Sequence, residues 1–427
     1  MSCVIGGMID STRCAAVGTL GGRVGWALGI LLGDWRLATG DWPRLSTSVA
    51  GIRRAGALPT LRPTMPAVPD DADRVVVDPA RIDAAWVQQV LQAAGVVGAG
   101  AVAAISLAAA QASTWSRLSR ISVHYRPGTP SVGTAAPTAL LLKRCGAESG
   151  EFGRSEVDYY RRDYLGAADA PLVPCFDAAY ADQPRRYHLL LEDLSASHRS
   201  GDDAPPDLPF GLALADSLAA LHAHRWGSQR LRPIHQAVAG PAEIDRYLAH
   251  ITPGLTPLMA LAGAVLPAAR VAGLPGLVAG LADSFKARAR DRRGMTLVHG
   301  DLNPGNLLIP RSGLGRVLLI DRQPFDWSLT AWLGASDLAG ALVPWWDSAL
   351  RHRLQGPVLR RYHAGLVARG VHDYPWAQLL ADWRLGVLMC LLGPVEWCVL
   401  PTDRERMRWL WTQQLQRALA ALDDLPA

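Results

Sequence analysis

The chain has 427 residues, of which 49% are hydrophobic and 19% charged, so it can bury a large core and is not an intrinsically disordered chain. Lys and Arg (43) exceed Asp and Glu (38) by only five, and no basic run occurs, which gives no reason to expect nucleic-acid binding. The six cysteines form no Cys-x-x-Cys pair and no uninterrupted apolar stretch reaches 18 residues. We therefore expect reduced thiols, no membrane span and a cytoplasmic protein.

The first 77 residues differ from those that follow. Gly, Arg and Pro are scattered through 1–77 without a helical or alternating period, and Leu58 to Asp73 is rich in Pro and Asp. We predict a poorly ordered N-terminal extension, with an upstream start codon that the cell does not use as the alternative. Organised sequence begins at Asp78-Pro79, which is typical of a helix start, and a helix is predicted over Arg81 to Ala94.

The rest of the chain divides into a strand-rich block and a helical block. Strands are predicted at 101–108, 117–125, 138–145, 172–179 and 186–191, with one helix at 152–164. Helices are predicted at 212–224, 242–250, 348–369, 376–392 and 404–422. By length alone we expect two or three domains of roughly 150 residues. The pattern predicts an α+β protein with a small β-rich lobe over 78–194 and a larger helical lobe over 195–427.

One loop-and-strand island interrupts the helical block. Apolar residues flank each of its polar clusters, which places Asp301, Asn306 and Asp321 on loops at the ends of short buried strands. Phosphoryl transfer needs a carboxylate to accept the proton of the incoming hydroxyl, and hard oxygen ligands to hold Mg²⁺ on the nucleotide phosphates. An Asp, an Asn five positions later and an Asp after a second strand suit that chemistry. The alternative is that these are ordinary turn residues.

The same island carries a family resemblance. The sequence His299-Gly300-Asp301-x-x-x-x-Asn306, followed by Leu319-Ile320-Asp321, closely resembles the catalytic and metal-binding segments of aminoglycoside phosphotransferases, choline kinases and ecdysteroid-kinase-like proteins. These are small-molecule kinases of the bilobal protein-kinase-like fold. The resemblance implies a phosphotransferase that uses ATP and Mg²⁺, with Asp301 as the catalytic base and Asn306 and Asp321 as metal ligands.

The resemblance extends to the strand-rich block. Lys143 ends an apolar strand, as the lysine that contacts the nucleotide phosphates does in kinases. Glu156 lies near the start of a segment that resembles the family's E-x-x-F/Y-Y helix, where a glutamate holds that lysine. Glu148, Glu151 and Asp158 are the competing carboxylates. A lysine at the end of a strand that extends its ammonium group into solvent is the alternative for Lys143.

Two nucleotide-binding segments are less clear. Glu192 and Leu194 follow the strand 187–191 and resemble the hinge whose backbone contacts adenine, although an ordinary strand exit gives the same pattern. The segment that would cover the phosphates has few glycines, and Ser113 and Thr114 offer hydroxyl and backbone N–H groups there.

Several polar residues near the motifs are predicted to have structural roles. His222 and His224 lie two positions apart on one helix and so point in different directions, which makes them poor joint metal ligands. We expect His299 to brace the loop, since Asp301 occupies the base position, and Asp337 to support the same loop. Arg322 stands where the family often has an aromatic residue, and pairing with a phosphate is one role open to it.

The acceptor is expected to bind against the helical block. Nine tryptophans follow Asp321, and some of them could form an aromatic wall near Asp347, Asp373 or Glu396. Aromatic faces and carboxylates suit a cationic or amphipathic alcohol. A catalytically silent kinase-like domain that binds nucleotide or a partner is the alternative function, favoured by the glycine-poor loop and Arg322. A protein kinase is a third possibility, weakened because no activation segment ending in Ala-Pro-Glu is recognisable.

Overall fold

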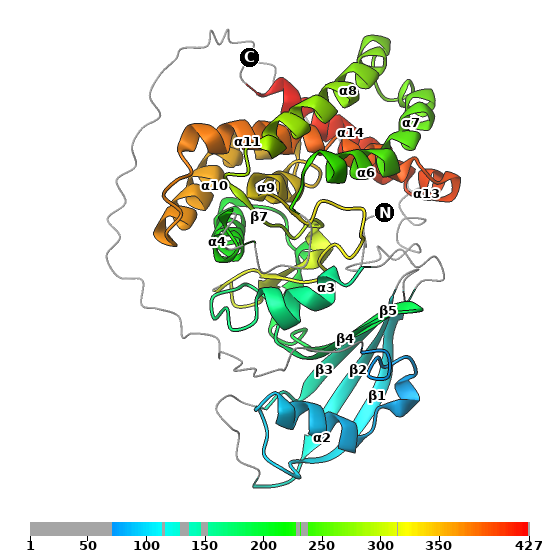
Figure 1. Cartoon of the computed structure of the whole chain (residues 1–427), viewed down its shortest axis with the longest axis vertical. Helices are drawn as coiled ribbons and strands as arrows, with labels where there is room; N and C mark the ends of the chain where they lie inside the picture. Colours follow the sequence, from blue (N-terminus) through cyan, green and yellow to red (C-terminus); the bar gives the residue numbers. More distant parts are fainter. Residues whose placement is uncertain are drawn as a thin grey trace, which may run out of the picture.

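The protein has a small sheet-containing lobe and a larger helical lobe (Figure 1). In this computed structural model the described residues are 71–112, 116–128, 136–146, 153–227, 231, 238–313 and 315–425. The α+β bilobal architecture predicted from the sequence is confirmed. Ser113 and Thr114 lie outside the described residues, as do 1–70 of the predicted extension.

The small lobe is built on one antiparallel sheet of five strands in the order β1-β2-β3-β5-β4. The strands are β1 Val102–Ala112, β2 Ser116–Tyr125, β3 Ala139–Gly146, β4 Cys175–Asp182 and β5 Arg185–Glu192. In this register Lys143 of the central strand lies opposite Leu118 on one side and Leu189 on the other. Lys143 is therefore held in the middle of the sheet, where neighbouring strands fix its backbone on both sides.

The two faces of the sheet pack against different parts of the molecule. Because side chains alternate along a strand, Leu140 and Leu142 of β3 point to one face and Lys143 and Cys145 to the other. Helix α2 (Ala84–Ala93) packs with the leucines, whereas Cys145 packs with residues from the helical lobe, among them Phe325. Lys143 is thus aimed between the lobes.

The N-terminal part of this lobe differs from the prediction in two respects. Asp78 caps only a short 3₁₀ turn, η1 (Pro79–Arg81), and α2 begins after its own N-cap, Asp83. The last residues of the predicted extension, 71–77, are packed: Val75 and Val76 are buried. The prediction placed the start of the packed chain too late because this segment has no helical or alternating pattern.

The helix predicted over 152–164 is shorter and irregular. It consists of the α-helical turn α3 (Ser155–Asp158) and the π-helical turn η2 (Tyr159–Asp163). Three residues of α3, Glu156, Val157 and Asp158, are each only 1% exposed. The turn is therefore embedded between the lobes and is stabilised by packing rather than by its length.

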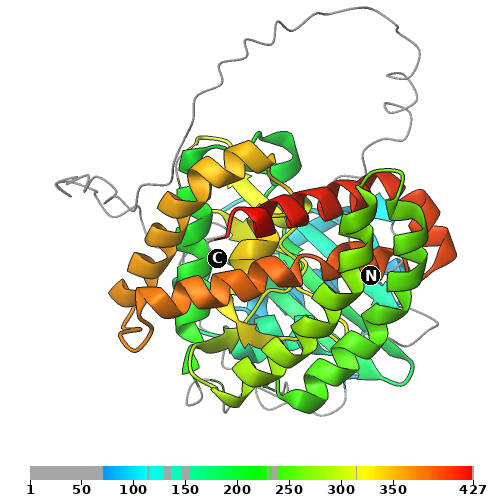
Figure 2. The same ribbon diagram turned by 90° about the horizontal axis from the view of Figure 1, so that it is seen from above.

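The helical lobe surrounds a core that includes Trp332 and Trp411. Its helices are α4 Leu208–His224, α6 Pro241–Ile251, α7 Leu255–Ala262, α8 Ala268–Arg290, α9 Gly334–Leu342, α10 Ser348–Ala368, α11 Trp376–Met389, α12 Leu392–Trp397, α13 Pro401–Arg406 and α14 Arg408–Asp423, with short turns at η3 Gly201–Asp203 and η4 Thr252–Gly254. Seen from above, α8, α11 and α14 lie side by side over the rest of the molecule (Figure 2). Helix α8 was not predicted, because Pro275 and its glycines resemble a loop.

One helical stretch of the described chain, Trp376–Trp397, is long and apolar enough to cross a membrane. Half of it is buried inside the helical lobe, as in the core helix of a globular protein.

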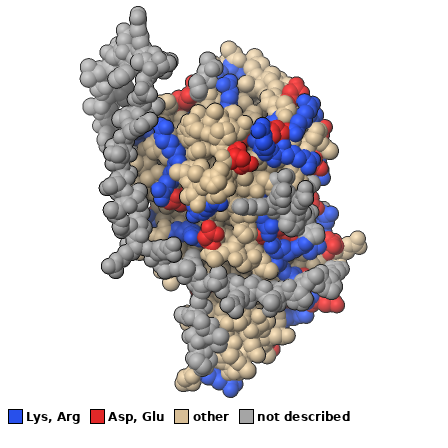
Figure 3. Space-filling model, turned by 60° about the vertical axis from the view of Figure 1, so that its left-hand side comes forward, with Lys and Arg blue, Asp and Glu red and all other residues tan. Residues whose placement is uncertain are grey.

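On the face shown in Figure 3, basic side chains lie in several separate groups next to acidic ones.

Short strands carry the polar loops of the island. Strands β7 (Met295–Leu297) and β10 (Ala331–Leu333) pair with each other, and β6 (His198–Ser200), β8 (Leu307–Pro310) and β9 (Leu318–Leu319) form a three-stranded sheet. The loop from β7 to β8 contains the 3₁₀ turn η5 (Pro304–Asn306). Because β8 pairs with β9, the two polar loops of the island are brought together.

Candidate active site

Lys143 contacts one carboxylate of the small lobe and one of the helical lobe. Its Nζ donates to both carboxylate oxygens of Glu156, at 2.8 and 2.7 Å, and also to Oδ1 of Asp321. The hydroxyl of Tyr187 donates to Glu156 as well. The lysine, the helical glutamate and the second aspartate predicted from the sequence are thus in direct contact, in a buried interior.

Asp321 is held in an uncommon backbone conformation. Its φ of 60° makes it the one described residue other than glycine with a positive φ, a region that Asp tolerates better than most residues. Burial raises the pKa of Asp321 to about 7, the ammonium group of Lys143 opposes that rise, and the charge of Glu156 adds to it. A cation beside Asp321 therefore favours the charged form of this carboxylate.

The loop from β7 to β8 presents Asp301 and Asn306 to the same space. The amide Nδ2 of Asn303 donates to Oδ1 of Asp301 at 3.1 Å, and Nδ2 of Asn306 donates to the backbone carbonyl of Asp301 at 2.8 Å. Burial raises the pKa of Asp301 to about 8; Asn303 lowers it, and Asp321 raises it further. A carboxyl group with a pKa in this range can accept a proton near neutral pH.

Three oxygen atoms of this group are buried and have no hydrogen-bond partner among the described residues: Oδ2 of Asp301, Oδ1 of Asn306 and Oδ2 of Asp321. Buried polar atoms are rarely left without a partner, so such a cluster indicates a ligand. The amide and carboxylate oxygens of Asn306 and Asp321 are the donors that Mg²⁺ prefers. The described chain has no cluster of three or more His, Cys, Asp or Glu side chains for a metal. Mg²⁺ bound with a nucleotide usually takes only one or two oxygens from the protein, and phosphates and water supply the rest. The two oxygens of Asn306 and Asp321 fit such an ion.

Asp337 stabilises the backbone of the loop that carries Asp301. Asp337 accepts hydrogen bonds from the N–H groups of His299 (2.6 Å) and Gly300 (2.9 Å). Burial alone would raise the pKa of Asp337, but the hydrogen bond with His222 and the charges of His222 and His299 lower it below the ordinary value. His222 also contacts the hydroxyl of Tyr362 at 2.8 Å. The structural roles predicted for Asp337 and His222 are confirmed.

His299 supports the same loop. Its Nε2 lies 2.9 Å from the carbonyl oxygen of Ile320, next to Asp321. Burial lowers the pKa of His299 to about 4, so the imidazole is neutral at pH 7 and donates to that carbonyl. His299 therefore has the loop-bracing role predicted from the sequence, and the structure shows in addition that it links the two polar loops.

The predicted hinge follows β5. The N–H groups of Glu192 and Asp193 donate to the carbonyls of Pro174 and Ala139, respectively. These two N–H groups are therefore already hydrogen-bonded within the protein. The N–H of Leu194 contacts no acceptor among the described residues, and its carbonyl accepts from Ser197 and His198. Burial raises the pKa of Glu192. Of the two hinge residues predicted to contact a nucleotide, only Leu194 thus has a free main-chain donor in the described chain.

Arg322 does not face the polar cluster. It is 1% exposed and donates to three main-chain carbonyls: Val298 from Nε (3.0 Å), Ser155 from Nη1 (3.1 Å) and Thr330 from Nη2 (3.2 Å). Its guanidinium also lies 4.9 Å from the centre of the Tyr159 ring. Pairing with a phosphate, the role left open from the sequence, is wrong, because all three nitrogens of the group are engaged inside the protein.

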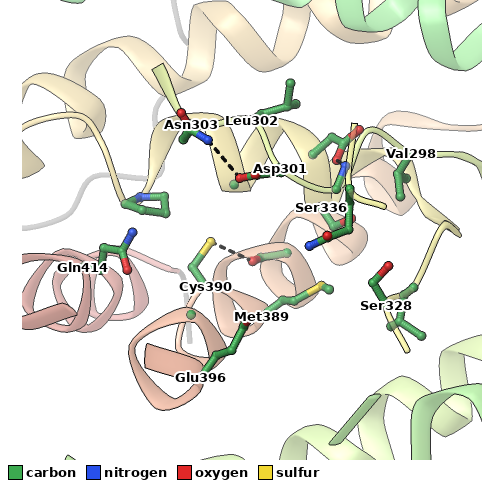
Figure 4. Close-up of a pocket in the computed structure, with 18 of the residues that line it drawn as sticks. Val298, Asp301, Leu302, Asn303, Ser328, Ser336, Met389, Cys390, Glu396 and Gln414 are labelled. Carbon is green, nitrogen blue, oxygen red and sulfur yellow. Dashed lines mark hydrogen bonds between the residues drawn. The ribbon is translucent and has the colours of Figure 1, made fainter. Parts of the chain in front are cut away.

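A cavity of about 150 Å³ lies next to Asp301 in the helical lobe (Figure 4). Figure 4 shows Asp301 and Asn303 on one side and Glu396 of α12 and Gln414 of α14 on the other. Aromatic residues complete the lining: Tyr247, Trp327, Trp345 and Trp397. Of the three carboxylates considered from the sequence, only Glu396 lines the cavity. Asp347 instead caps α10, and Asp373 is exposed.

Gln414, Asn303 and Tyr187 belong to this site but were not among the residues predicted from the sequence. Gln414 lies more than a hundred positions after Asp301 in an amphipathic helix, where a glutamine is ordinarily a surface residue. It is 6% exposed, and its Oε1 has no partner among the described residues. Asn303 had the clearest signal, since it lies inside the recognised motif.

No family model matches the sequence. The solved structures similar to it include the following three. The ethanolamine kinase of Plasmodium vivax is 12% identical, with 75% of this chain and 84% of that chain covered and a TM-score of 0.47. A spectinomycin phosphotransferase in complex with ADP and spectinomycin is 10% identical, with 81% and 99% covered and a TM-score of 0.44. The choline kinase of Streptococcus pneumoniae is 13% identical, with 79% and 98% covered and a TM-score of 0.44.

Proposed function

We propose that this protein is an O-phosphotransferase that moves the γ-phosphoryl group of ATP to a hydroxyl group of a small molecule, with Mg²⁺ as the metal. The observation that carries the proposal is the contact of Lys143 with both Glu156 and Asp321, beside the buried oxygens of Asp301 and Asn306 that lack protein partners. A cation, a metal-binding pair and a base are the parts that phosphoryl transfer requires.

Asp301 is the base in this proposal. Its Oδ2 accepts the proton of the acceptor hydroxyl while the hydroxyl oxygen bonds to the γ-phosphorus and the bond from that phosphorus to the β-phosphate oxygen breaks, which releases ADP. The hydrogen bond from Asn303 fixes the orientation of the carboxyl group, so that Oδ2 is the free oxygen. Burial in the loop excludes water, which would otherwise compete as the acceptor.

Lys143 contacts the phosphates and Glu156 holds it in place. Asn306 and Asp321 hold Mg²⁺, whose chemistry when bound is to neutralise charge on the nucleotide phosphates. The N–H of Leu194 is the main-chain group that we assign to the nucleotide base. The roles proposed for Ser113 and Thr114 remain predictions, as does a cytoplasmic location.

The acceptor binds in the cavity beside Asp301. Its described lining includes the carboxylates of Asp301, Asp337 and Glu396 and no Lys or Arg, so a neutral or cationic alcohol fits and an anionic one is disfavoured. Its aromatic side chains offer flat surfaces to an apolar or cationic part of the acceptor. Cavities of this size hold a group about as large as benzene, so the part of the acceptor that enters is small.

The test is a screen of hydroxylated metabolites and antibiotics for acceptor-dependent ADP release, run with Mg²⁺ and with EDTA. The D321N variant is the matched control, because it removes one proposed metal ligand without changing the size of the side chain. We expect at least one acceptor to raise ADP release in the presence of Mg²⁺, and D321N to abolish the rise. Tight ATP binding with no turnover across a broad panel would instead identify a nucleotide-binding domain without catalytic activity.

A further inference from the structure

Arg322 connects three segments that carry the proposed site. The carbonyl of Ser155 belongs to the turn that presents Glu156, the carbonyl of Val298 immediately precedes the His299-Gly300-Asp301 loop, and Thr330 precedes β10. Arg322 itself follows Asp321. The side chain of Arg322 thus contacts the main chain beside Glu156 and the main chain close to Asp301. Arg322 is also the neighbour in sequence of Asp321, a proposed metal ligand.

The planar guanidinium is suited to this position. Its nitrogens diverge in a fixed fork, so that Nε, Nη1 and Nη2 each reach a different carbonyl, whereas a lysine has only a single point charge. Its central carbon, Cζ, lies over the ring of Tyr159, which starts the π-helical turn after α3. The segment that holds Glu156 is therefore contacted at two places, Ser155 and Tyr159.

Further hydrogen bonds join the same two segments. The hydroxyl of Ser155 donates to the carbonyl of Gln323 at 2.7 Å, and the N–H of Gly153 donates to the carbonyl of Pro324 at 2.8 Å. The N–H of Gln323 donates to the carbonyl of His299 at 3.1 Å. The chain directly after Asp321 is thus bonded to the turn of Glu156 on one side and to the loop of Asp301 on the other, with Arg322 buried at the junction.

We propose that Arg322 is a positioning residue, which fixes the turn carrying Glu156 relative to the loop carrying Asp301 and so sets the distance from the Lys143–Glu156 pair to the base. This role depends on the proposed function only for its effect on catalysis. Arg322 touches neither substrate nor metal and acts through Glu156 and the loop of Asp301.

Amide hydrogen exchange in the protein without nucleotide tests the placement directly. The amides of Asp158, Tyr164 and Val298 are hydrogen-bonded within or beside the linked segments. In the wild type, local opening of these segments has to break the contacts of Arg322, which makes opening less favourable. R322M lacks these contacts, so we expect the three amides to exchange at least about tenfold faster. An arginine with a merely structural role would instead accelerate exchange across the whole helical lobe, α10 included.

The matched control is R351K. Arg351 is also 1% exposed, and it contacts Gln355 and Asp424, neither of which belongs to the two polar loops. We expect R351K to leave the exchange of Asp158, Tyr164 and Val298 unchanged. Unchanged exchange of these amides in R322M, or equal acceleration in R322M and R351K, would overturn the proposal whether or not the protein transfers a phosphoryl group.

Kinetics of the transfer reaction give the second measurement. R322K keeps the charge but loses the fork, and we expect its kcat to fall at least about tenfold while the KM for ATP changes less than about threefold. In the E156Q background the same substitution should lower kcat by less than about threefold, because its effect passes through Glu156. A kcat for R322K within about twofold of the wild type contradicts the role. So does an R322K/E156Q double variant whose loss in kcat equals the product of the losses in the two single variants. Absence of transfer in the wild type would count against the proposed function alone, since hydrogen exchange still decides the role of Arg322.

Discussion

The ammonium group of Lys143 lies 2.8 and 2.7 Å from the two carboxylate oxygens of Glu156, and the side chains are only 5% and 1% exposed. Charges this deeply buried are stable only as long as each has its partner. The pair is therefore a structural element and, in the proposed function, also a catalytic one, and the two contributions can be measured separately.

Replacing Lys143 by methionine should destabilise the fold and abolish activity. Glu156 and Asp321 would lose the cation that they share, and breaking a buried pair on one side costs about 3–5 kcal/mol. Urea unfolding measures this loss. The control is K286M, whose partner Asp245 lies at the surface and is 60% exposed, so its effect should stay within about 0.5 kcal/mol. Equal stability of the two variants would contradict the buried-pair interpretation.

The isosteric variant D301N should separate catalysis from binding. It keeps the size of the side chain but removes the proton acceptor, so we expect acceptor-dependent ADP release to fall by about 10²–10⁴-fold. Binding of ATP and Mg²⁺, measured by titration calorimetry, should remain close to that of the wild type. Asp347 caps α10 elsewhere, and D347N serves as the control for a changed carboxylate. Wild-type turnover in D301N would exclude Asp301 as the base.

Filling the cavity beside Asp301 should weaken acceptor binding alone. Gly393 lines this cavity, and a Cβ atom added there would meet only Oε1 of Gln414, at 3.7 Å, so a valine side chain fits the backbone and occupies the space of the acceptor. We expect G393V to raise the acceptor KM about tenfold or more with the KM for ATP unchanged. G356V is the control, since nothing lies within 4 Å of a Cβ at that helical position. A similar change in both variants would place the acceptor elsewhere.

Asp163 should make stability depend on pH in a predictable direction. Burial raises its pKa from an ordinary 3.8 to about 6, so between these values the folded carboxyl keeps a proton that the unfolded chain releases. Stability from this group is therefore present below pH 4 and is lost as the pH rises through 6. D163N stays neutral, and its stability relative to the wild type should increase by about 3 kcal/mol between pH 4 and pH 7.5.

The comparison with D163N is needed because His299 acts in the opposite direction. Burial lowers the pKa of His299 to about 4, so stability from this group rises with pH between 4 and 6.5. The profile of the wild type combines the effects of Asp163 and His299 with those of the buried carboxyls of Asp301 and Asp321. Urea unfolding of both proteins at each pH isolates Asp163. A difference between them that does not change with pH would show that this carboxyl is charged in the fold throughout the range.

The sequence predicted the residues at the centre of the site because each lies in or just after a short apolar strand. Lys143 follows the apolar residues 139–142 within β3, and Asp301 and Asp321 lie just beyond β7 and β9, so local pattern and strand pairing together bring them into one place. Around the cavity, Glu396 was one of three carboxylates considered from the sequence, but no local pattern distinguished it from Asp347 and Asp373. Gln414 reaches the cavity from α14 only through the packing of the helical lobe, which no local pattern records.

Arg322 and α8 show two further limits of sequence interpretation. A charged residue beside a proposed metal ligand suggests a contact with a bound ligand, but here three carbonyls of the surrounding backbone bind the guanidinium. Arg322 consequently gives no support to a silent domain. In α8, tertiary contacts overcome the low helix propensity of Pro275 and the glycines around it.

The packing of residues 71–76 determines where the protein can be shortened. The N–H of Val76 donates to Nδ1 of the fully buried His188, and Arg74 pairs with Asp177 at 2.6 Å. Asp71 pairs with Arg161 in the turn that follows Glu156. A truncated protein that begins at Asp78 would leave the polar groups of His188, Asp177 and Arg161 without these partners. It would also lose the contact of Asp71 that stabilises the turn following Glu156. A minimal active fragment therefore has to retain the chain from Asp71 onward.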